Sequence, residues 1–284
     1  MTDATKRDRR EHAREVARLE REKEKKKRLR NRIFIQGGVV LAVIAVAIVG
    51  VLIFQSATKS TVAHAGPANM ISDGILFADA DGAIAPVTSG SIPIDGTPTP
   101  TTSDETDGVA DVVTYVDWTC PICQQFEATY ADQLAGLVTS GTATLEVHPI
   151  AILDKNYAGS RYSSRAANAA ACVANYDPEN FLAAQSAMYV NQGTEGTTGL
   201  TNNQIKGILT DAGVTSSDVV SCIDDETFAS WVSDATTRAT GDATLADPST
   251  GGFGTPTVMI NGVRWDGSTD IIAAIDAAAA AEAS

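Results

Sequence analysis

The sequence has only four cysteines and three histidines among 284 residues, and aromatic residues make up 6% of it. Four cysteines are too few for a small scaffold that is held together by disulfides. Hydrophobic residues (44%) and charged residues (20%) stand near the level of an ordinary globular protein. The composition therefore excludes a wholly disordered, a collagen-like or a multi-span membrane chain, and it fits one substantial domain with additions.

Basic residues are scarce outside the N-terminal tail. Residues 1–32 hold 14 of the 21 Lys and Arg and seven of the 35 Asp and Glu, so the tail carries 14 − 7 = +7. Residues 33–284 hold the remainder and carry 7 − 28 = −21. This acidic main part lacks the clustered basic surface that nucleic-acid binding requires, so no nucleic-acid partner is expected.

Charge is absent from residues 33–54, which read IFIQGGVVLAVIAVAIVGVLIF. At 1.5 Å per residue, a helix of this length spans the ~30 Å hydrocarbon core of a lipid bilayer. The alternative is a cleaved signal peptide, since Ala63-His64-Ala65 resembles a cleavage site, but the apolar run exceeds the usual signal length. We predict an uncleaved signal anchor and a single-pass membrane protein. Because basic residues precede the apolar segment, we expect residues 1–32 to stay in the cytoplasm and the acidic part that follows the segment to lie outside the cytoplasmic membrane.

Residues 55–108 are rich in Ser, Thr, Gly, Pro and Asp, a composition typical of an extended tether. We therefore predict an extracytoplasmic spacer that precedes a folded domain at 109–284. Met70–Leu76 and Ile84–Ile94 contain short apolar runs, and a hairpin packed on the domain is the alternative for this part. The boundary near residue 109 stays open for that reason.

Strand and helix patterns alternate from residue 109 onward. Val109–Asp117 and Thr144–Leu153 are predicted strands, Pro121–Thr139 is a predicted helix between them, and residues 160–240 contain several helix-length segments. The C-terminal part is predicted to contain a strand at Pro256–Ile260, a type I′ turn at Asn261-Gly262, a return strand at Val263–Trp265 and a helix at Ile271–Ala281. This order predicts an α/β fold.

The chemistry-bearing motif is Cys120-Pro121-Ile122-Cys123, at the junction of the first strand and the first helix. Unpaired N–H groups and the macrodipole at a helix N-terminus stabilise a thiolate, so Cys120 is the predicted solvent-reachable nucleophile of low pKa. Cys123, one turn further, is the predicted resolving thiol. Pro121 suits the first turn of a helix, and Trp118 and Ile122 complete the predicted active-site turn.

Two other interpretations of the Cys-x-x-Cys pair stand beside a redox site. A structural zinc site needs two more ligands, but His12 lies in the predicted tail and His64 in the predicted spacer, so no metal site is predicted. A purely structural disulfide is the second alternative, although such pairs rarely close so tight a ring at a helix start. The third histidine, His148, lies on a predicted strand and is interpreted as structural.

Tyr115–Cys123 and Gly254–Thr257 together resemble the thioredoxin fold, and specifically the exported DsbA family of disulfide oxidoreductases in its actinobacterial form. Ser160–Cys172 is similar to the start of that family's helical insertion. The resemblance implies a thioredoxin fold with a helical insertion at about 160–240, and it implies no cofactor. It also implies a cis-proline at Pro256, which leaves the Thr255 backbone free to pair with a client chain beside Cys120.

The sequence departs from the family pattern at two points. The family's best-known members have a buried acid six positions before the first cysteine, where this chain has Thr114. Asp117 is the nearest acid in the sequence and is a candidate for proton transfer; a partly exposed carboxylate at the strand end is the alternative. The second departure is Ile122 in place of the histidine of the most oxidising relatives, so thiolate stabilisation rests on the helix terminus.

Cys172 and Cys222 remain, both within the predicted helical region. Two spare cysteines in an oxidising compartment are expected to pair, and the resemblance implies the same structural disulfide. A second redox-active pair is the alternative.

The predicted function is disulfide formation in unfolded or reduced exported proteins by the Cys120–Cys123 pair. The resemblance implies a membrane reoxidant of the DsbB or vitamin-K-epoxide-reductase-like type. A reductase or isomerase, for example in cytochrome c maturation, is one alternative. A non-enzymatic binding module on the same scaffold is the other.

Overall fold

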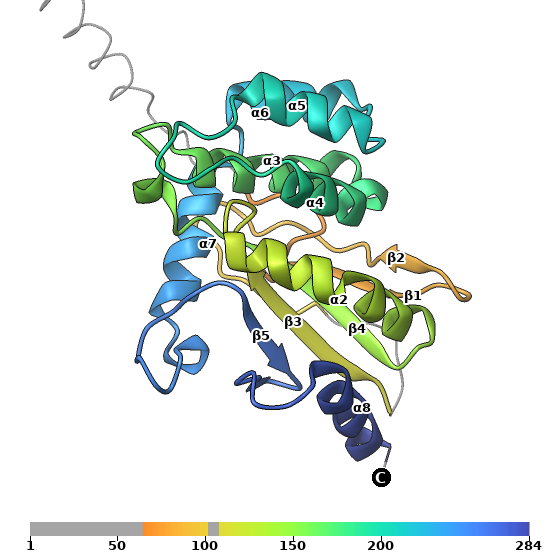
Figure 1. Cartoon of the computed structure of the whole chain (residues 1–284). Helices are drawn as coiled ribbons and strands as arrows, with labels where there is room; N and C mark the ends of the chain where they lie inside the picture. Colours follow the sequence, from red (N-terminus) through yellow and green to blue (C-terminus); the bar gives the residue numbers. More distant parts are fainter. Residues whose placement is uncertain (1–64, 102–107, 284) are drawn as a thin grey trace, which may run out of the picture. The chain divides into compact units, whose positions relative to one another are not determined.

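The computed structural model describes residues 65–101 and 108–283 (Figure 1). The predicted tail at 1–32 and the predicted transmembrane segment at 33–54 lie outside these residues. Within the described part, none of the helices combines the length and the apolar character needed to cross a bilayer.

A six-stranded sheet with the order β2-β1-β4-β3-β5-β6 forms the centre of the fold (Figure 1). The two central strands, β3 (Ala110–Val116) and β4 (Ala143–Pro149), run parallel to each other. On the other side of β3, β5 (Thr257–Ile260) is antiparallel to both β3 and β6 (Val263–Arg264). Because β3 is central, the turn that follows it is fixed on both sides by neighbouring strands.

The strands β1 (Ile75–Asp79) and β2 (Ile84–Pro86) form a hairpin that extends the sheet beyond β4. β1 pairs antiparallel with β4, with Ile75 opposite Val147, and four of its five residues are buried. A loose spacer is therefore the wrong description of this segment, and the hairpin alternative is right. The apolar side chains of β1 gain burial only by pairing with β4, which the local Ser/Thr/Gly/Pro composition does not reveal.

Two helices pack on one face of the sheet: α2 (Pro121–Thr139) against β4 and β1, and α8 (Ile271–Glu282) against β3 and β5. The opposite face carries a smaller apolar cluster that joins the sheet to α7 (Ala229–Gly241) and the following single turn η3 (Ala243–Leu245). Alternate residues of β3 therefore point to different helices. Val112, Thr114 and Val116 are buried toward α2 and α8, whereas Val113 and Tyr115 contact the α7 side.

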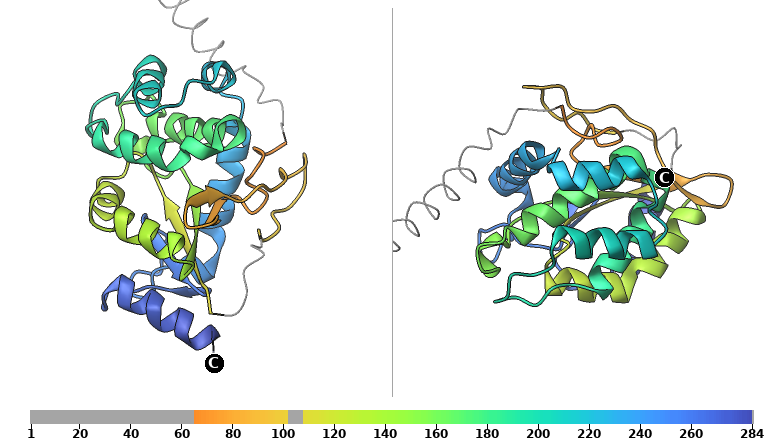
Figure 2. Two further views of the ribbon diagram at one scale, coloured as in Figure 1. Left: turned by 90° about the vertical axis from the view of Figure 1, so that its right-hand side faces the viewer. Right: turned by 90° about the horizontal axis from the view of Figure 1, so that it is seen from above.

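The remaining helices lie between β4 and β5 in the sequence and gather at one end of the sheet (Figures 1 and 2). This helical region agrees with the insertion predicted at about 160–240. Its helices are α3 (Tyr162–Tyr176), α4 (Phe181–Val190), α5 (Asn202–Asp211) and α6 (Ser217–Asp225), with the short turns η1 (Asp154–Asn156) and η2 (Pro178–Asn180) before α3 and α4. Six of the 15 residues of α3 are alanines, all of them buried, and these small side chains let α4, α6 and α7 approach the helix closely.

The strand predicted at Thr144–Leu153 ends earlier than expected, at Pro149. Beyond that residue, the backbone N–H of Ala151 donates to Thr236 Oγ1 at 3.0 Å, and the N–H of Ile152 donates to Asp117 Oδ2 at 3.0 Å. The strand stops because side chains, and not a neighbouring strand, accept these hydrogen bonds.

Cys172 of α3 and Cys222 of α6 form the disulfide expected from the sequence, with their Cα atoms 5.8 Å apart. Both side chains are buried in the main core. The bridge therefore fastens α6 to the central helix of the helical region.

Candidate active site

Cys120 is the residue that caps the N-terminus of α2, directly after β3 and its turn. Its backbone is extended (φ −84°, ψ 122°), and Pro121 follows in the first turn of the helix. The Cys120 N–H donates to the Asp117 carbonyl at 2.9 Å, which closes the turn. No side-chain hydrogen bond caps this helix. The N–H groups of its first turn thus remain available to a negatively charged sulfur.

Cys120 and Cys123 are both free thiols in this structure. Their side chains are 6% and 1% exposed, respectively. The expectation of a solvent-reachable Cys120 therefore requires correction, because its side chain is buried as part of the main core cluster. Between the two cysteines, Pro121 and Ile122 are exposed, the latter by 56%, so they form the outer rim of the site.

The two thiols have opposite pKa shifts. A hydrogen bond from the Cys123 side chain, with help from the backbone N–H groups of Cys123 and Ile122, lowers the pKa of Cys120 to about 6, although burial opposes this. Burial, followed by the hydrogen bond to Cys120, raises the pKa of Cys123 well above its usual value. At neutral pH the pair thus consists of a Cys120 thiolate and a Cys123 thiol, which are the forms that a nucleophile and a resolving thiol require.

Alkylation tests this assignment. In the reduced protein, the rate of Cys120 modification by iodoacetamide is expected to rise with pH and to reach half of its maximum near pH 6. The substitution Cys123→Ala removes the main hydrogen bond to the sulfur and is expected to move the midpoint toward the ordinary value of about 8.5. Mass spectrometry of quenched samples gives both curves. A wild-type midpoint above pH 8 would contradict the proposed thiolate stabilisation.

The loop before β5 brings Thr255 and Pro256 to the cysteines from a distant part of the sequence. The Thr255–Pro256 peptide bond is cis. The Cys120 thiol donates to the Thr255 carbonyl at 3.4 Å, and the Thr257 hydroxyl holds the loop by donating to the Gly254 carbonyl at 2.7 Å. A main-chain carbonyl therefore lies next to the Cys120 sulfur.

Trp118 anchors the active-site turn to the helical region. Its side chain is 1% exposed, and its indole N–H donates to Gln185 Oε1 of α4 at 3.1 Å. Its ring also packs on Phe181, with 5.7 Å between the centroids, and its carbonyl accepts from the Gln192 side chain at 3.0 Å. These contacts give Trp118 a positioning role in the turn.

Asp117 is completely buried, so the alternative of a partly exposed strand-end carboxylate is wrong. One oxygen accepts from the backbone N–H and the hydroxyl of Thr119, at 2.9 and 2.7 Å. The other accepts from the N–H of Ile152 at 3.0 Å and from the Ser163 hydroxyl at 2.6 Å. Burial raises the pKa of Asp117, and these four hydrogen bonds counteract it. The carboxylate thus joins the active-site turn to the segment after β4 and to α3.

The comparisons with known proteins agree with this geometry. A family model described as thioredoxin matches residues 104–277, more than half of the chain. The chain belongs to the thioredoxin family. The comparison with curated proteins gives no match.

Among solved structures, this thioredoxin-family chain is similar to reduced DsbA from Mycobacterium tuberculosis, with 26% identity, a TM-score of 0.51 and coverage of 74% of this chain and 99% of that one. It is also similar to the reduced disulfide bond oxidoreductase DsbG of the same organism, with 30% identity and a TM-score of 0.49. This match covers 62% of the present chain and 85% of DsbG. MdbA, a thiol-disulfide oxidoreductase from Corynebacterium diphtheriae, matches at 16% identity with a TM-score of 0.50. This match covers 72% of the present chain and 93% of MdbA.

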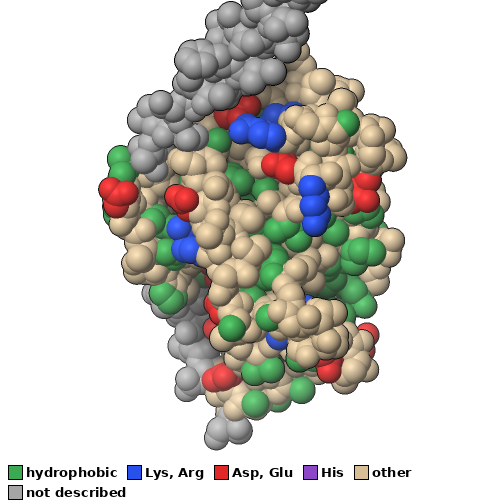
Figure 3. All heavy atoms as spheres, turned by 90° about the vertical axis from the view of Figure 1, so that its left-hand side faces the viewer, with side chains coloured by type: hydrophobic (Ala, Val, Ile, Leu, Met, Phe, Trp, Pro, Cys, Tyr) green, Lys and Arg blue, Asp and Glu red, His purple; other side chains and the backbone are tan. Residues whose placement is uncertain are grey.

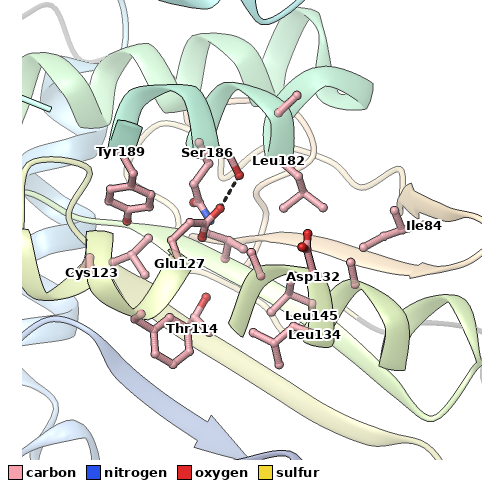
Figure 4. A pocket seen from close by; sticks show the side chains of 17 residues that line it. Ile84, Thr114, Cys123, Glu127, Asp132, Leu134, Leu145, Leu182, Ser186 and Tyr189 are labelled. Carbon is pink, nitrogen blue, oxygen red and sulfur yellow. Dashed lines mark hydrogen bonds between the residues drawn. The ribbon is translucent and has the colours of Figure 1, made fainter. Parts of the chain in front are cut away.

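Three residues near the pair in this thioredoxin-family chain were not identified from the sequence: Glu127, Gln185 and Tyr189. Together with Cys123 they line a cavity of about 260 Å³ between α2, α4 and the sheet (Figure 4). A signal existed for Glu127, because it follows Cys123 by four residues and so shares its helix face. The residues on α4 gave no such signal, since only the tertiary fold brings that helix over α2.

The described residues contain no group of three or more His, Cys, Asp and Glu side chains that is placed to hold a metal ion. His148 is buried on β4, with its Nε2 3.3 Å from Glu146 Oε1, and its ring packs on Tyr115. Tyr115 points away from the α2 face of the sheet. These contacts agree with the structural interpretation of His148.

Proposed function

We propose that this chain is a membrane-anchored disulfide oxidase that introduces disulfides into reduced exported proteins. The chain is a thiol–disulfide oxidoreductase of the DsbA-like kind. The observation that carries the oxidase direction is the lowered pKa of Cys120, about 6, at the start of α2. Stabilising the Cys120 thiolate stabilises the reduced enzyme, and a stable reduced form makes the oxidised enzyme a stronger oxidant.

The reaction begins with the oxidised enzyme, in which Cys120 and Cys123 share a disulfide. A client thiolate attacks the Cys120 sulfur, the Cys120–Cys123 bond breaks, and its electron pair remains on the Cys123 sulfur. A second client thiolate then attacks the client sulfur of the mixed disulfide, which forms the client disulfide and releases Cys120 as a thiolate. The low pKa of Cys120 makes it a good leaving group in this second step. The client loses two electrons, and the enzyme pair gains them.

Client binding is proposed at the rim of the site, where Thr255 and Pro256 lie beside Cys120. A main-chain carbonyl at this position is suited to hydrogen bonding with an extended client chain. Ile122 and Pro121 add exposed apolar surface, which favours unfolded clients over folded ones. On the side of the molecule where α2 begins, hydrophobic side chains gather in an area with few charges (Figure 3).

Anchoring and reoxidation are further parts of the proposal. The apolar segment 33–54 would hold the domain at the outer surface of the cell membrane, with residues 1–32 in the cytoplasm. Each cycle leaves the Cys120–Cys123 pair reduced, so an electron acceptor must restore the disulfide. By resemblance, we propose a membrane reoxidant of the DsbB or vitamin-K-epoxide-reductase-like type. The exchange chemistry itself requires no cofactor or metal.

The role of Asp117 in proton transfer stays a prediction. Its two oxygens already accept four hydrogen bonds from Thr119, Ile152 and Ser163, and these favour a positioning role for the carboxylate. The reduction step nevertheless requires a proton at Cys123.

The reduction potential of the Cys120–Cys123 pair tests the proposed direction of electron flow. We expect equilibrium titration of the full-length chain in glutathione buffers, read by alkylation and mass, to give about −120 to −180 mV, the range of disulfide donors. A value near about −270 mV, as in thioredoxin, would support the reductase alternative. A pair that never changes its redox state would support the binding module.

A further inference from the structure

The leaving sulfur of the proposed reaction is buried and needs a proton. The Cys123 side chain is 1% exposed, and burial raises its pKa well above the usual value. A Cys123 thiolate formed when the disulfide breaks is therefore unstable until it is protonated. The proton therefore has to come from a group that can reach this buried sulfur. This inference rests on the proposed function.

The interior side of Cys123 is a cavity of about 260 Å³ (Figure 4). Apolar side chains form most of its walls, among them Val116, Leu134, Leu145 and Leu182. Cys123 lies at one end, and the hairpin residue Ile84 lies at the other (Figure 4). A group that delivers a proton to Cys123 from behind must line this cavity.

Glu127 lines the cavity on the same face of α2 as Cys123. Two side chains of α4 fix its carboxyl group: Ser186 donates to one oxygen at 2.5 Å, and Gln185 donates to the other at 3.1 Å. Burial raises the pKa of Glu127 despite these hydrogen bonds. The carboxyl group thus keeps its proton to a higher pH than an exposed glutamate, as a general acid must.

Tyr189 of α4 lies over Cys123 at the same end of the cavity (Figure 4). Its side chain is buried, and its hydroxyl has no hydrogen-bond partner among the described residues. Burial raises the pKa of Tyr189 well above its usual value, and the charges of Cys123 and then Glu127 add to this effect. The hydroxyl thus has no partner of its own and belongs to a residue that lines the same cavity as Cys123 and Glu127. An unpartnered buried hydroxyl is costly and calls for a function.

We propose that Glu127 is the acid that protonates Cys123, with the Tyr189 hydroxyl passing the proton across the cavity. As the client thiolate bonds to Cys120, the Cys120–Cys123 bond breaks and Cys123 becomes a thiolate. The Tyr189 hydroxyl gives its proton to the Cys123 sulfur and receives one from the Glu127 carboxyl group. The products are a Cys123 thiol and a Glu127 carboxylate, and Glu127 regains its proton from solvent.

The other titratable groups around Cys123 are less suited to this step. Asp117, directly after β3, is occupied by four donors, and Cys120 is bonded to the client. Asp132 of α2 also lines the cavity, but it is exposed and lies toward the end far from Cys123 (Figure 4). At the position six before Cys120, Thr114 has no acidic proton, and its hydroxyl donates to the Glu146 carbonyl at 3.2 Å. Glu127 is the remaining acid that lines the cavity.

The test is a pH profile of single-turnover reduction. The full-length oxidised chain is mixed with dithiothreitol, and reduction is followed by tryptophan fluorescence from pH 5 to 9, with rates divided by the thiolate fraction of the reagent. The wild-type rate is expected to fall as pH rises through the pKa of Glu127. The variant Glu127→Gln is expected to react about 100-fold more slowly at low pH and to lose this dependence. Glu127→Asp is expected to restore part of the rate and the dependence.

Asp132→Asn is the matched control, because it removes a carboxylate from the same helix and cavity and is expected to react like the wild type. Thermal unfolding shows whether Glu127→Gln is folded; if it is not, Tyr189→Phe takes its place, with an expected loss of about tenfold. A folded Glu127→Gln or Tyr189→Phe with the wild-type rate and profile would overturn the inference. So would loss of the pH dependence in Asp117→Asn alone. If the wild-type pair itself fails to exchange with dithiols, the proposed function is what fails.

Discussion

The variant Cys120→Ser is expected to lose all ability to form disulfides in a reduced client. Without the Cys120 sulfur the enzyme has no disulfide at the start of α2 and no site for the client thiolate to attack. The companion variant Cys123→Ser keeps the nucleophile but loses the resolving thiol, so with an oxidised client its Cys120 thiolate is expected to attack the client disulfide and to accumulate as a mixed disulfide. Free-thiol assays of the client and non-reducing gels with mass spectrometry measure the two outcomes.

The control for this experiment is Ile122→Ala, which changes the exposed residue between the two cysteines and leaves both sulfurs in place. It is expected to exchange with dithiothreitol at the wild-type rate. Its reaction with an unfolded client is expected to slow, because apolar contact surface at the rim is lost. A Cys120→Ser variant that still performs the wild-type role in cells would instead support the binding module.

The double variant Cys172→Ala/Cys222→Ala is expected to lose about 4 kcal/mol of unfolding free energy. The bridge closes a loop across a sequence separation of 50 and so restricts the unfolded chain. It also fastens α6 to α3, whose small buried side chains offer few alternative anchors. Denaturant unfolding of the oxidised wild type and of the double variant gives the difference.

The neighbouring Ser221→Ala is the matched control on α6, because Ser221 is exposed and its hydroxyl bonds only within the helix, to the Ser217 carbonyl. Its unfolding free energy is expected to stay within about 0.5 kcal/mol of the wild type. The double variant is also expected to keep the wild-type reduction potential of Cys120–Cys123, since the bridge plays no part in the exchange. Equal stability of double variant and wild type would refute the structural role, and a changed potential would favour a second redox pair.

Local physical chemistry made the active-site turn predictable from the sequence. The Cys-Pro-x-Cys spacing after a strand-like run places Cys120 at a helix start, because Pro121 favours the first turn and Cys123 falls one turn later. The structure agrees on these positions. The α/β order and the helical region were predictable for the same reason, since hydrophobic periodicity depends on near neighbours along the chain.

Burial and hydrogen bonding in the site were not predictable, because their partners come from distant segments. Asp117 is fully buried only because Ile152 and Ser163 donate to it from beyond β4. The first strand of the sheet was obscured by its spacer-like surroundings, and pairing with β4 decided its structure.

By itself, the sequence determined where Cys120 and Cys123 stand on the helix and predicted that their sulfurs react, because a Cys-x-x-Cys spacing and helix capping are local. The predicted membrane anchor at 33–54 also came from the sequence alone, and it lies outside the described residues. Tertiary structure alone decided the cavity behind Cys123, where α4 places Tyr189 over the sulfur and fixes the carboxyl group of Glu127. The reason is physical: the pKa of a buried group depends on desolvation and on the donors around it, and the fold assembles both from separate parts of the chain.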